Sequence, residues 1–263
     1  MSEQSLYTLP NGQIILHHNQ YETEFVYREI FENKVYFKHG ITLEGDASVL
    51  DVGANIGLFA LYVSLHYPSA KIFSFEPAPQ NCRLFQHNLE KYPRVKLFQQ
   101  GLAGHNGEAQ FTYYPGYSIM SGFHADSEED TEVLKHGITQ QLKQRQLPEP
   151  DHKRFADLML GDKLQNAEHY SCALQTVSSF IEQENIEQID LLKVDAEKAE
   201  MDIFSGIGSD DWNLIQKIVV EVHDPETASN VTRLLTEKGL RVLQEQEAGF
   251  GEAGIYNLYA FRH

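Results

Sequence analysis

The stretch SVLDVGANIGLFALYVS, residues 48–64, decides the fold. A short apolar run ends at Asp51, a turn with two glycines follows, and an apolar segment with helical spacing comes next. Beyond Pro68 a second apolar run, KIFSFEP, begins at residue 71. This order of strand, glycine turn, helix and strand predicts two parallel strands joined through a helix, and therefore an α/β fold.

The same alternation continues on both sides of a longer interruption. The predicted strands are 94–100, 108–114, 172–177, 189–195, 217–224, 241–246 and 255–262. The predicted helices are 79–92, 178–184, 196–204 and 225–238. Ser179 and Glu182 have the spacing of a capping box. We therefore expect a mostly parallel seven-stranded sheet with a C-terminal antiparallel hairpin, as in Rossmann-like class I methyltransferases.

The 263 residues suit one enlarged domain. Four parts of it are expected: a helical N-terminal extension (1–46), the first half of the cofactor-binding sheet (47–116), an insertion (117–170) and the second half of the sheet (171–263). The insertion breaks the strand and helix rhythm, so it predicts a lid that shapes the substrate site, with an ordinary surface subdomain as the alternative.

The composition excludes several classes of protein. A net charge of −17 without a basic patch argues against binding of nucleic acid or an anionic membrane. Cys82 and Cys172 lie far apart without a CxxC motif, so neither a zinc site nor a disulfide scaffold is expected. The sequence shows no signal peptide and no apolar run long enough for a membrane span, which predicts a soluble, cytoplasmic protein.

The glycine turn reads D-x-G-x-N-x-G, with Asp51, Gly53, Asn55 and Gly57 as its fixed positions. A dinucleotide fold would have G-x-G-x-x-G, because a pyrophosphate sits on helix N–H groups. An acid in the first position repels a pyrophosphate but suits a ligand with an ammonium group. Glu76, at the end of the second strand, is placed to accept hydrogen bonds from ribose hydroxyls. These features predict S-adenosylmethionine rather than NAD.

Other residues are expected near this ligand. Gly101 and Leu102, at the end of the third strand, are predicted to lie beside the adenine. Tyr36 belongs to an aromatic run that packs an N-terminal helix on the sheet or covers the cofactor. For Asn55, capping of the following helix is the alternative to a cofactor contact.

With these residues in place, the chain resembles the FkbM family of S-adenosylmethionine-dependent methyltransferases. The matching motifs are VLDVGANIGLFALYVS, FEP, DLLKVDAEKAE and IVVEVHD, in order from about Tyr27 onward. Two further segments resemble the subgroup of this family that is found in polyketide and mixed peptide–polyketide assembly lines. They are VYREIFENKVYFKHGI and SIMSGFHAD. That resemblance implies O-methylation of a carrier-bound intermediate. Many family members have glycine where this chain has Lys198.

Transfer of a methyl group to a hydroxyl needs a base. In KIVVEVHD, His223 ends an apolar run and is the predicted base, with Glu221 on the same strand face to orient it. A structural role at the strand end is the alternative for His223. Asp195 is predicted to face both cofactor and substrate, Glu197 to bond the substrate or His223, and Glu200 to lie on a helix surface.

Asp195, Glu197 and His223 are also possible metal ligands by type, but we expect no metal. The resemblance implies O-methylation of a hydroxyl of a polyketide or peptide–polyketide intermediate that is bound to a carrier protein. N- or O-methylation of a free small molecule and non-catalytic binding of S-adenosylmethionine are the alternatives. Neither the acceptor nor the oligomeric state follows from the sequence.

Overall fold

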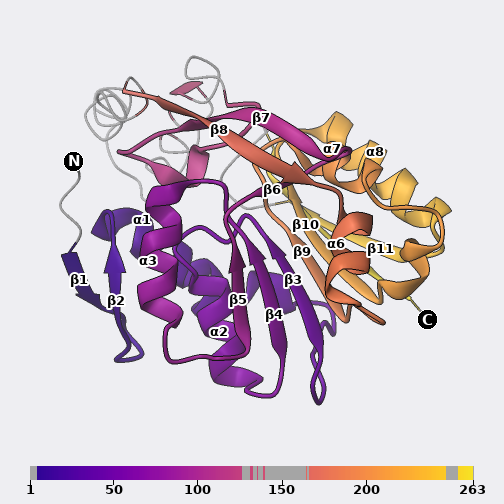
Figure 1. Cartoon of the computed structure of the whole chain (residues 1–263), viewed down its shortest axis with the longest axis horizontal. Coiled ribbons are helices and arrows are strands. Elements are labelled where there is room, and N and C mark those ends of the chain that lie inside the picture. The colour runs from indigo at the N-terminus through magenta and orange to yellow at the C-terminus, as the bar shows by residue number, and fades with distance from the viewer. Residues whose placement is uncertain are drawn as a thin grey trace.

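The structure is a computed structural model that describes residues 5–125, 131, 132, 135, 139, 164, 166–246 and 254–262 (Figure 1). Its central sheet has seven strands in the order β11-β12-β10-β9-β3-β4-β5. These are β3 (Ser48–Val52), β4 (Lys71–Phe75), β5 (Val95–Phe98), β9 (Leu191–Val194), β10 (Lys217–Val222), β11 (Arg241–Gln246) and β12 (Tyr256–Phe261). Only β12 runs antiparallel to its neighbours β10 and β11. The predicted sheet with its C-terminal hairpin is confirmed.

Helices cover both faces of this sheet, as parallel strands require. They are α2 (Leu58–His66), α3 (Pro79–Leu89), α6 (Val177–Glu184), α7 (Glu200–Ser205) and α8 (Pro225–Glu237), with the short η5 (Asp211–Leu214) before β10. On β3, Val49 packs with α2 and α3 in one apolar core, whereas Leu50 and Val52 pack with α6, α7 and α8 in the other. Among the described residues, no helix has the length and apolar character needed to cross a membrane.

The start of α6 differs from the prediction. Its N-cap is Thr176, whose hydroxyl accepts a hydrogen bond from the backbone N–H of Ser179. The predicted capping box of Ser179 and Glu182 is therefore wrong, because the N-cap lies three residues earlier, at Thr176.

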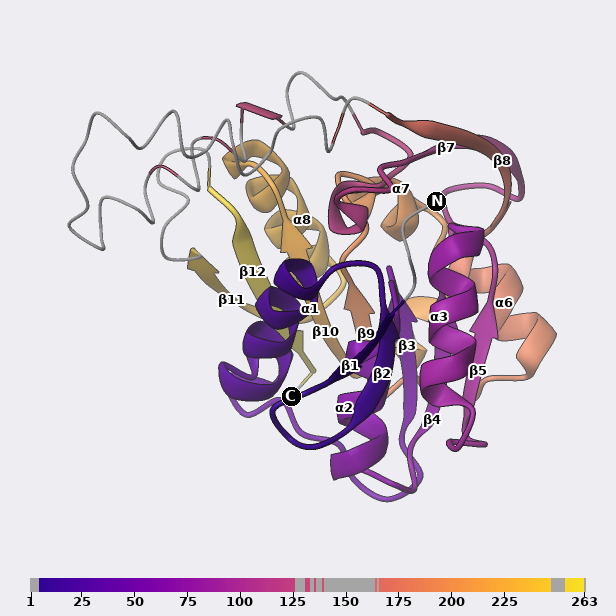
Figure 2. The ribbon, with the colours of Figure 1, turned by 90° about the vertical axis from the view of Figure 1, so that its left-hand side faces the viewer.

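The N-terminal extension is only partly helical. It begins with a hairpin of β1 (Ser5–Thr8) and β2 (Ile14–His17), followed by α1 (Gln20–Tyr27), the π-helical turn η1 (Arg28–Glu32) and the 3₁₀ turn η2 (Val35–Phe37). A tight turn joins the two strands, with Gly12 at φ 85° and its N–H bonded to the carbonyl of Leu9. The extension packs on the core that contains α2 and α3, and Figure 2 shows β2 and α1 in front of the sheet.

A second sheet of three strands crosses above one end of the central sheet in both views (Figures 1 and 2). It has the order β6-β8-β7, from β6 (Gly101–Leu102), β7 (Gly107–Tyr113) and β8 (Glu168–Gln175). The strands predicted at 108–114 and 172–177 were expected in the central sheet, which is wrong, because they pair antiparallel with each other. Both expose part of one face, as a strand outside the buried sheet does.

The short turn η3 (Ser118–Met120) follows β7. Most of the predicted lid, between residue 126 and the start of β8, lies outside the described residues. The two cysteines are both buried and free.

Candidate active site

A cavity of about 1250 Å³, counting its open mouth, lies at the carboxyl ends of β3, β4, β9 and β10. This is where ligands of open α/β sheets bind. Its wall contains six acidic side chains, Glu22, Glu29, Glu76, Asp195, Glu197 and Glu221. Lys193 and His18 are the basic side chains among the lining residues. The acidic excess favours a ligand with positive charge.

The glycine turn forms one side of the cavity and explains both of its glycines. Gly53 has φ 79°, and a Cβ there would lie 1.7 Å from the carbonyl oxygen of Asp195. Gly57 has φ 93° and is the N-cap of α2, where a Cβ would come within 2.5 Å of the Leu89 side chain. Glycine is therefore needed for close packing at both positions. The alternative role of Asn55 as the helix cap is wrong, because Gly57 occupies that position.

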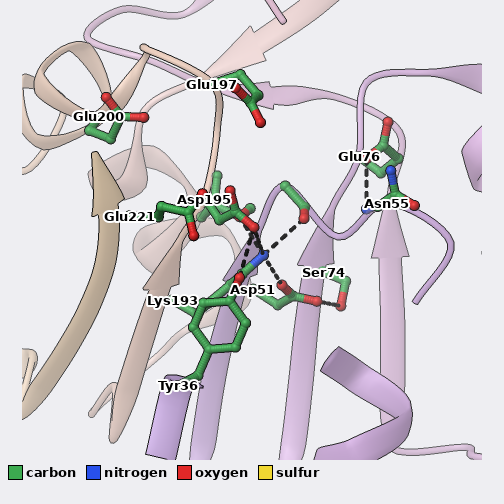
Figure 3. A network of polar contacts seen from close by, with 12 residues as sticks. Tyr36, Asp51, Asn55, Ser74, Glu76, Lys193, Asp195, Glu197, Glu200 and Glu221 are labelled. Carbon is green, nitrogen blue, oxygen red and sulfur yellow. Dashed lines mark hydrogen bonds and ion pairs between the residues drawn. The ribbon is translucent and has the colours of Figure 1, made fainter. Parts of the chain in front are cut away.

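Glu76 follows β4 and faces the turn. Its carboxylate accepts a hydrogen bond from the backbone N–H of Asn55 at 2.8 Å (Figure 3). It also accepts hydrogen bonds from the backbone N–H of Ala78 at 2.8 Å and from Asn81 Nδ2 at 3.2 Å. Burial raises the pKa of this carboxyl to about 7, although these hydrogen bonds oppose the rise. The bonds fix the carboxylate in one position on the cavity wall.

Gly101 and Leu102, in β6, also line the cavity. A Cβ on Gly101 would lie 2.6 Å from the ring of Phe123, and Phe111 and Phe123 are lining residues too. The predicted adenine region is thus an apolar part of the wall, beside Glu76.

The N-terminal extension supplies another wall. Glu22 of α1 is buried and accepts hydrogen bonds from the backbone N–H of Ser118, at 3.1 Å, and from the Ser118 hydroxyl. Asn55 Nδ2 donates to the same hydroxyl at 3.1 Å. Burial raises the pKa of Glu22 despite these bonds. Polar contacts thereby join the extension, the segment after β7 and the glycine turn around the cavity.

A row of polar side chains crosses the buried sheet beneath the cavity. Ser74, Asp51 and Lys193 are register partners on β4, β3 and β9. Ser74 Oγ donates to Asp51 Oδ2 at 3.0 Å, and Lys193 Nζ lies 3.3 Å from Asp51 Oδ1 (Figure 3). Asp51 has no exposed surface and is not a lining residue of the cavity. The carboxylate of Asp51 faces Lys193, and its contact with the ligand stays a prediction.

Lys193 links this row to the cavity, and sequence reasoning missed it. Nζ donates to the carbonyls of Val52 at 3.2 Å and Gly53 at 2.9 Å, and lies 3.5 Å from Asp195 Oδ2. Burial lowers its pKa, but Asp51 and Asp195 outweigh this and hold it above the usual value. A lysine inside the apolar run LLKV was the available signal.

Asp195 and Tyr36 meet at this point. The Tyr36 hydroxyl donates to Asp195 Oδ2 at 2.9 Å, and both residues line the cavity (Figure 3). Burial, together with the charge of Asp195, raises the pKa of Tyr36 well above its ordinary value, so the hydroxyl stays protonated. The aromatic segment before the sheet therefore both packs and contributes a polar group to the site.

His223 lies among three carboxylates. Its Nε2 is 3.3 Å from Glu197 Oε2 and 3.4 Å from Glu221 Oε1, and Nδ1 is 3.9 Å from Glu200 Oε1. Glu197 and Glu221 line the cavity, whereas His223 does not. Figure 3 shows the Glu197, Glu221 and Asp195 side chains on the side of the site opposite Glu76.

His223, Glu197, Glu221 and Glu200 lie close enough together for the protonation of one to affect the others. Burial lowers the pKa of His223, but the negative charges of Glu197, Glu221 and Glu200 outweigh it and hold the pKa well above its ordinary value. Burial raises the pKa of Glu197 to about 8 and that of Glu200 to about 7, with His223 opposing both. Such groups titrate as a unit, with His223 protonated while its carboxylate partners are charged.

Glu200 corrects one prediction. It was expected on a helix surface, but it is 1% exposed and its carboxylate accepts a hydrogen bond from the backbone N–H of Lys198. The helix α7 starts at Glu200, so the carboxylate sits at the positive end of the helix and points toward His223.

The turn that carries Glu197 has an unusual backbone. Glu197 and Lys198 have φ values of 46° and 71°, in the left-handed region that glycine adopts more readily. Glycine at position 198 would adopt this geometry without a steric cost. Within the described residues, no group of three or more His, Cys, Asp or Glu side chains is arranged to hold a metal ion.

The sheet order, with β12 antiparallel between β10 and β11 and a ligand cavity over the glycine turn, is that of the Rossmann-like methyltransferases. Residues 51–247 match the family model described as the Methyltransferase FkbM domain. The chain belongs to this family and is an S-adenosylmethionine-dependent methyltransferase.

Similar proteins include the 31-O-demethyl-FK506 methyltransferase FkbM of Streptomyces tacrolimicus, which is 35% identical over 257 residues, 97% of this chain and 95% of that protein. The AMB antimetabolite synthetase AmbE of Pseudomonas aeruginosa is 38% identical over 97% of this chain, which spans only 12% of the synthetase. Among solved structures, M. capricolum TrmK in complex with S-adenosyl-homocysteine aligns with a TM-score of 0.47 and 7% identity, covering 89% of this chain and 68% of that one.

Proposed function

We propose that the protein methylates a hydroxyl group of a polyketide or peptide–polyketide intermediate presented on a carrier protein. The observation that carries the O-methyltransferase part is the carboxylate of Glu197, which lines the cavity and has His223 at 3.3 Å behind it. A buried carboxylate with a pKa of about 8 can accept the proton that a hydroxyl loses. Support for the substrate class comes from the relatives, one an O-methyltransferase by name and one an antimetabolite synthetase.

The cavity fits the methyl donor. S-adenosylmethionine supplies a methyl group on a positively charged sulfur, and the acidic wall suits that charge. We assign the ribose hydroxyls to Glu76 and the adenine to the wall at Gly101 and Leu102. Asn55, Tyr36 and Asp195 would border the amino acid part of the donor, and Gly53 leaves room for it. Asp51 would support this site indirectly, because its carboxylate holds the ammonium group of Lys193 in place.

In the reaction, the acceptor oxygen forms a bond to the methyl carbon as the bond from that carbon to sulfur breaks. The hydroxyl proton passes to Glu197. His223, which carries a proton and lies behind Glu197 and Glu221, stabilises the carboxylate form that accepts this proton. His223 is thus proposed as a positioning residue instead of the direct base, because Glu197 and Glu221 separate it from the cavity.

Two variants test the proton acceptor. Glu197→Gln should lower kcat at least about 100-fold with little change in the Kd of S-adenosylhomocysteine, because the base is lost and the donor site is not. Glu187→Gln, at an exposed position, is the matched control and should behave like wild type. Methylation by Glu197→Gln at a near wild-type rate would remove Glu197 from this role.

The pH dependence gives a second measurement. Since Glu197 must be ionised to accept a proton and its pKa is about 8, kcat/KM should rise with pH between 6 and 9. His223→Gln should shift the midpoint of this rise upward, because the carboxylate loses its positive partner. An unchanged midpoint would mean that His223 does not act through Glu197.

The carrier is tested separately, with hydroxyacyl groups presented as carrier-bound thioesters and as the free hydroxy acids. We expect turnover on the thioesters at least about tenfold faster, because the acidic cavity repels a free carboxylate. Equal rates would favour a free small molecule as the substrate.

Two further measurements test the rest of the proposed function. Analysis of the product separates methylation of an oxygen from methylation of a nitrogen. Loss of turnover in EDTA, with recovery when magnesium is added, would show that the enzyme requires a metal ion.

A further inference from the structure

The turn that carries Glu197 is held in place by its neighbours in the sequence and in space. A Cβ at Gly53 would lie 1.7 Å from the carbonyl oxygen of Asp195, so this turn and the glycine turn are in direct backbone contact. The backbone N–H of Lys198 donates to the Glu200 carboxylate at 3.0 Å. The turn therefore has little room to move away from a group that presses on it.

Gly122, in the segment SIMSGFHAD after β7, packs against the same turn. A Cβ at Gly122 would lie 3.1 Å from Glu197 Cβ and 3.2 Å from the Glu197 carbonyl oxygen, which is tighter than ordinary van der Waals contact. The φ angle of Gly122 lies outside the left-handed region, so its backbone does not require glycine. The missing side chain instead allows the close approach to Glu197, and both residues line the cavity.

The backbone of Gly122 is fixed to the three-stranded sheet. Its N–H donates to the carbonyl of Thr112 at 3.0 Å, and the N–H of Thr112 donates to the Gly122 carbonyl at 3.1 Å. The next residue, Phe123, packs edge to face on Phe111 with ring centres 5.1 Å apart. Because neither side of the contact can yield freely, the place of Glu197 depends on the absence of a side chain at position 122.

We propose that Gly122 positions Glu197 for proton transfer, so that the three-stranded sheet helps to set the place of the proton acceptor. This inference rests on the proposed role of Glu197. With glycine at position 122, the Glu197 carboxylate lines the cavity and lies 3.3 Å from His223. A methyl group there would displace its neighbour by a few tenths of an ångström, which lengthens the contact with His223 and misaligns the acceptor oxygen.

Turnover tests this role through Gly122→Ala, with Gly107→Ala as the matched control. Gly107 begins β7, and a Cβ there would meet no atom closer than 3.5 Å. We expect kcat to fall at least about tenfold in Gly122→Ala, with the KM for S-adenosylmethionine within about twofold of wild type. The rise of kcat/KM with pH should also move upward, because Glu197 lies further from the positive charge of His223.

Gly107→Ala should match wild type in kcat, KM and the midpoint of the pH profile. A wild-type kcat in Gly122→Ala would overturn the proposal. A lower kcat with an unchanged midpoint would also overturn it, because a general loss of stability does not move the pH profile of the folded enzyme.

A double-mutant cycle tests the contact without any acceptor. Gly122→Ala should lower the midpoint of thermal unfolding by about 3 °C or more. In a Glu197→Gly background, which lacks the Cβ that meets position 122, the same substitution should lower the midpoint less than half as much. Equal losses in the two backgrounds would contradict the proposal. If Gly122→Ala does not fold, folding of the double variant supports the contact and its failure to fold refutes it.

The cycle also separates this inference from the proposed function. Normal methylation by Glu197→Gln would refute the proposed proton acceptor, and coupling between positions 122 and 197 would then describe packing alone. An inactive Glu197→Gln without such coupling would leave the proposed function standing and remove the positioning role of Gly122.

Discussion

Lys193 joins the buried interior of the sheet to the cavity. Its ammonium group contacts Asp51 and Asp195, donates to the glycine turn, and lies 5.4 Å from the ring centre of Tyr36. The lysine side chain is 3% exposed and the Asp51 side chain 0%, so each charge depends on the other. A charge of this kind is costly when its partner is removed.

Lys193→Met should lower the free energy of unfolding by about 3–5 kcal/mol, because Asp51 is left buried without a positive partner. Urea unfolding monitored by circular dichroism measures this change. Lys71→Met, at an exposed position of β4, should change it by less than about 0.5 kcal/mol. The double variant Asp51→Asn with Lys193→Met should recover part of the loss, and no recovery would contradict the pairing.

The sequence could show that Lys193 interrupts an apolar strand, but not what it pairs with. Asp51 is its partner because β3 and β9 are neighbours in register, and that adjacency joins residues 142 positions apart. The same limit applies to Asp51, whose position before the glycine turn suggested a ligand contact. The positions of Glu76 and Gly53 on the cavity wall were predictable, because each follows from the local pattern of strand and turn.

The turn between β9 and α7 has a strained backbone and places Glu197 at the cavity wall. Lys198→Gly should be more stable than Lys198→Ala by about 1 kcal/mol, because only glycine adopts φ 71° without a steric cost. Both variants remove the same side chain, so the comparison isolates the backbone. The midpoints of thermal unfolding decide the order, and a more stable alanine variant would refute the strain.

The strands of the central sheet were predictable from their continuous apolar runs, and the helices from their spacing. The three-stranded sheet was not, because β7 and β8 have ordinary strand patterns and differ only in their partners. The N-terminal hairpin was also missed, although Asn11 and Gly12 mark its turn. Local pattern identifies a strand, whereas the choice of partner depends on contacts distant in the sequence.

The molecule carries a net charge of −17 and still buries several acidic side chains. Burial raises the pKa of Glu76 and Glu200 to about 7 and that of Glu197 to about 8, and the carboxylates raise the pKa of His223. Between pH 4.5 and 8 the folded chain therefore binds more protons at these groups than the unfolded chain does. Its stability must fall as the pH rises through this window.

We expect the free energy of unfolding to decrease by about 2 kcal/mol or more from pH 5.5 to pH 8.5. Urea unfolding across this range, without ligand, measures the change. Glu197→Gln should flatten the dependence, since it removes one of the groups that gains a proton on folding. A stability that stays constant or increases toward pH 8.5 would contradict the raised pKa values.

The position of β12 sets an order on folding. This strand follows β11 in the chain, yet it lies between β10 and β11 and pairs with both along six residues each. During synthesis β11 emerges first and has no partner in the central sheet, while β10 keeps an open edge. The half of the sheet that holds Glu221 and His223 therefore closes only after β12 has been made, and until then the open edge of β10 is exposed to association with other chains.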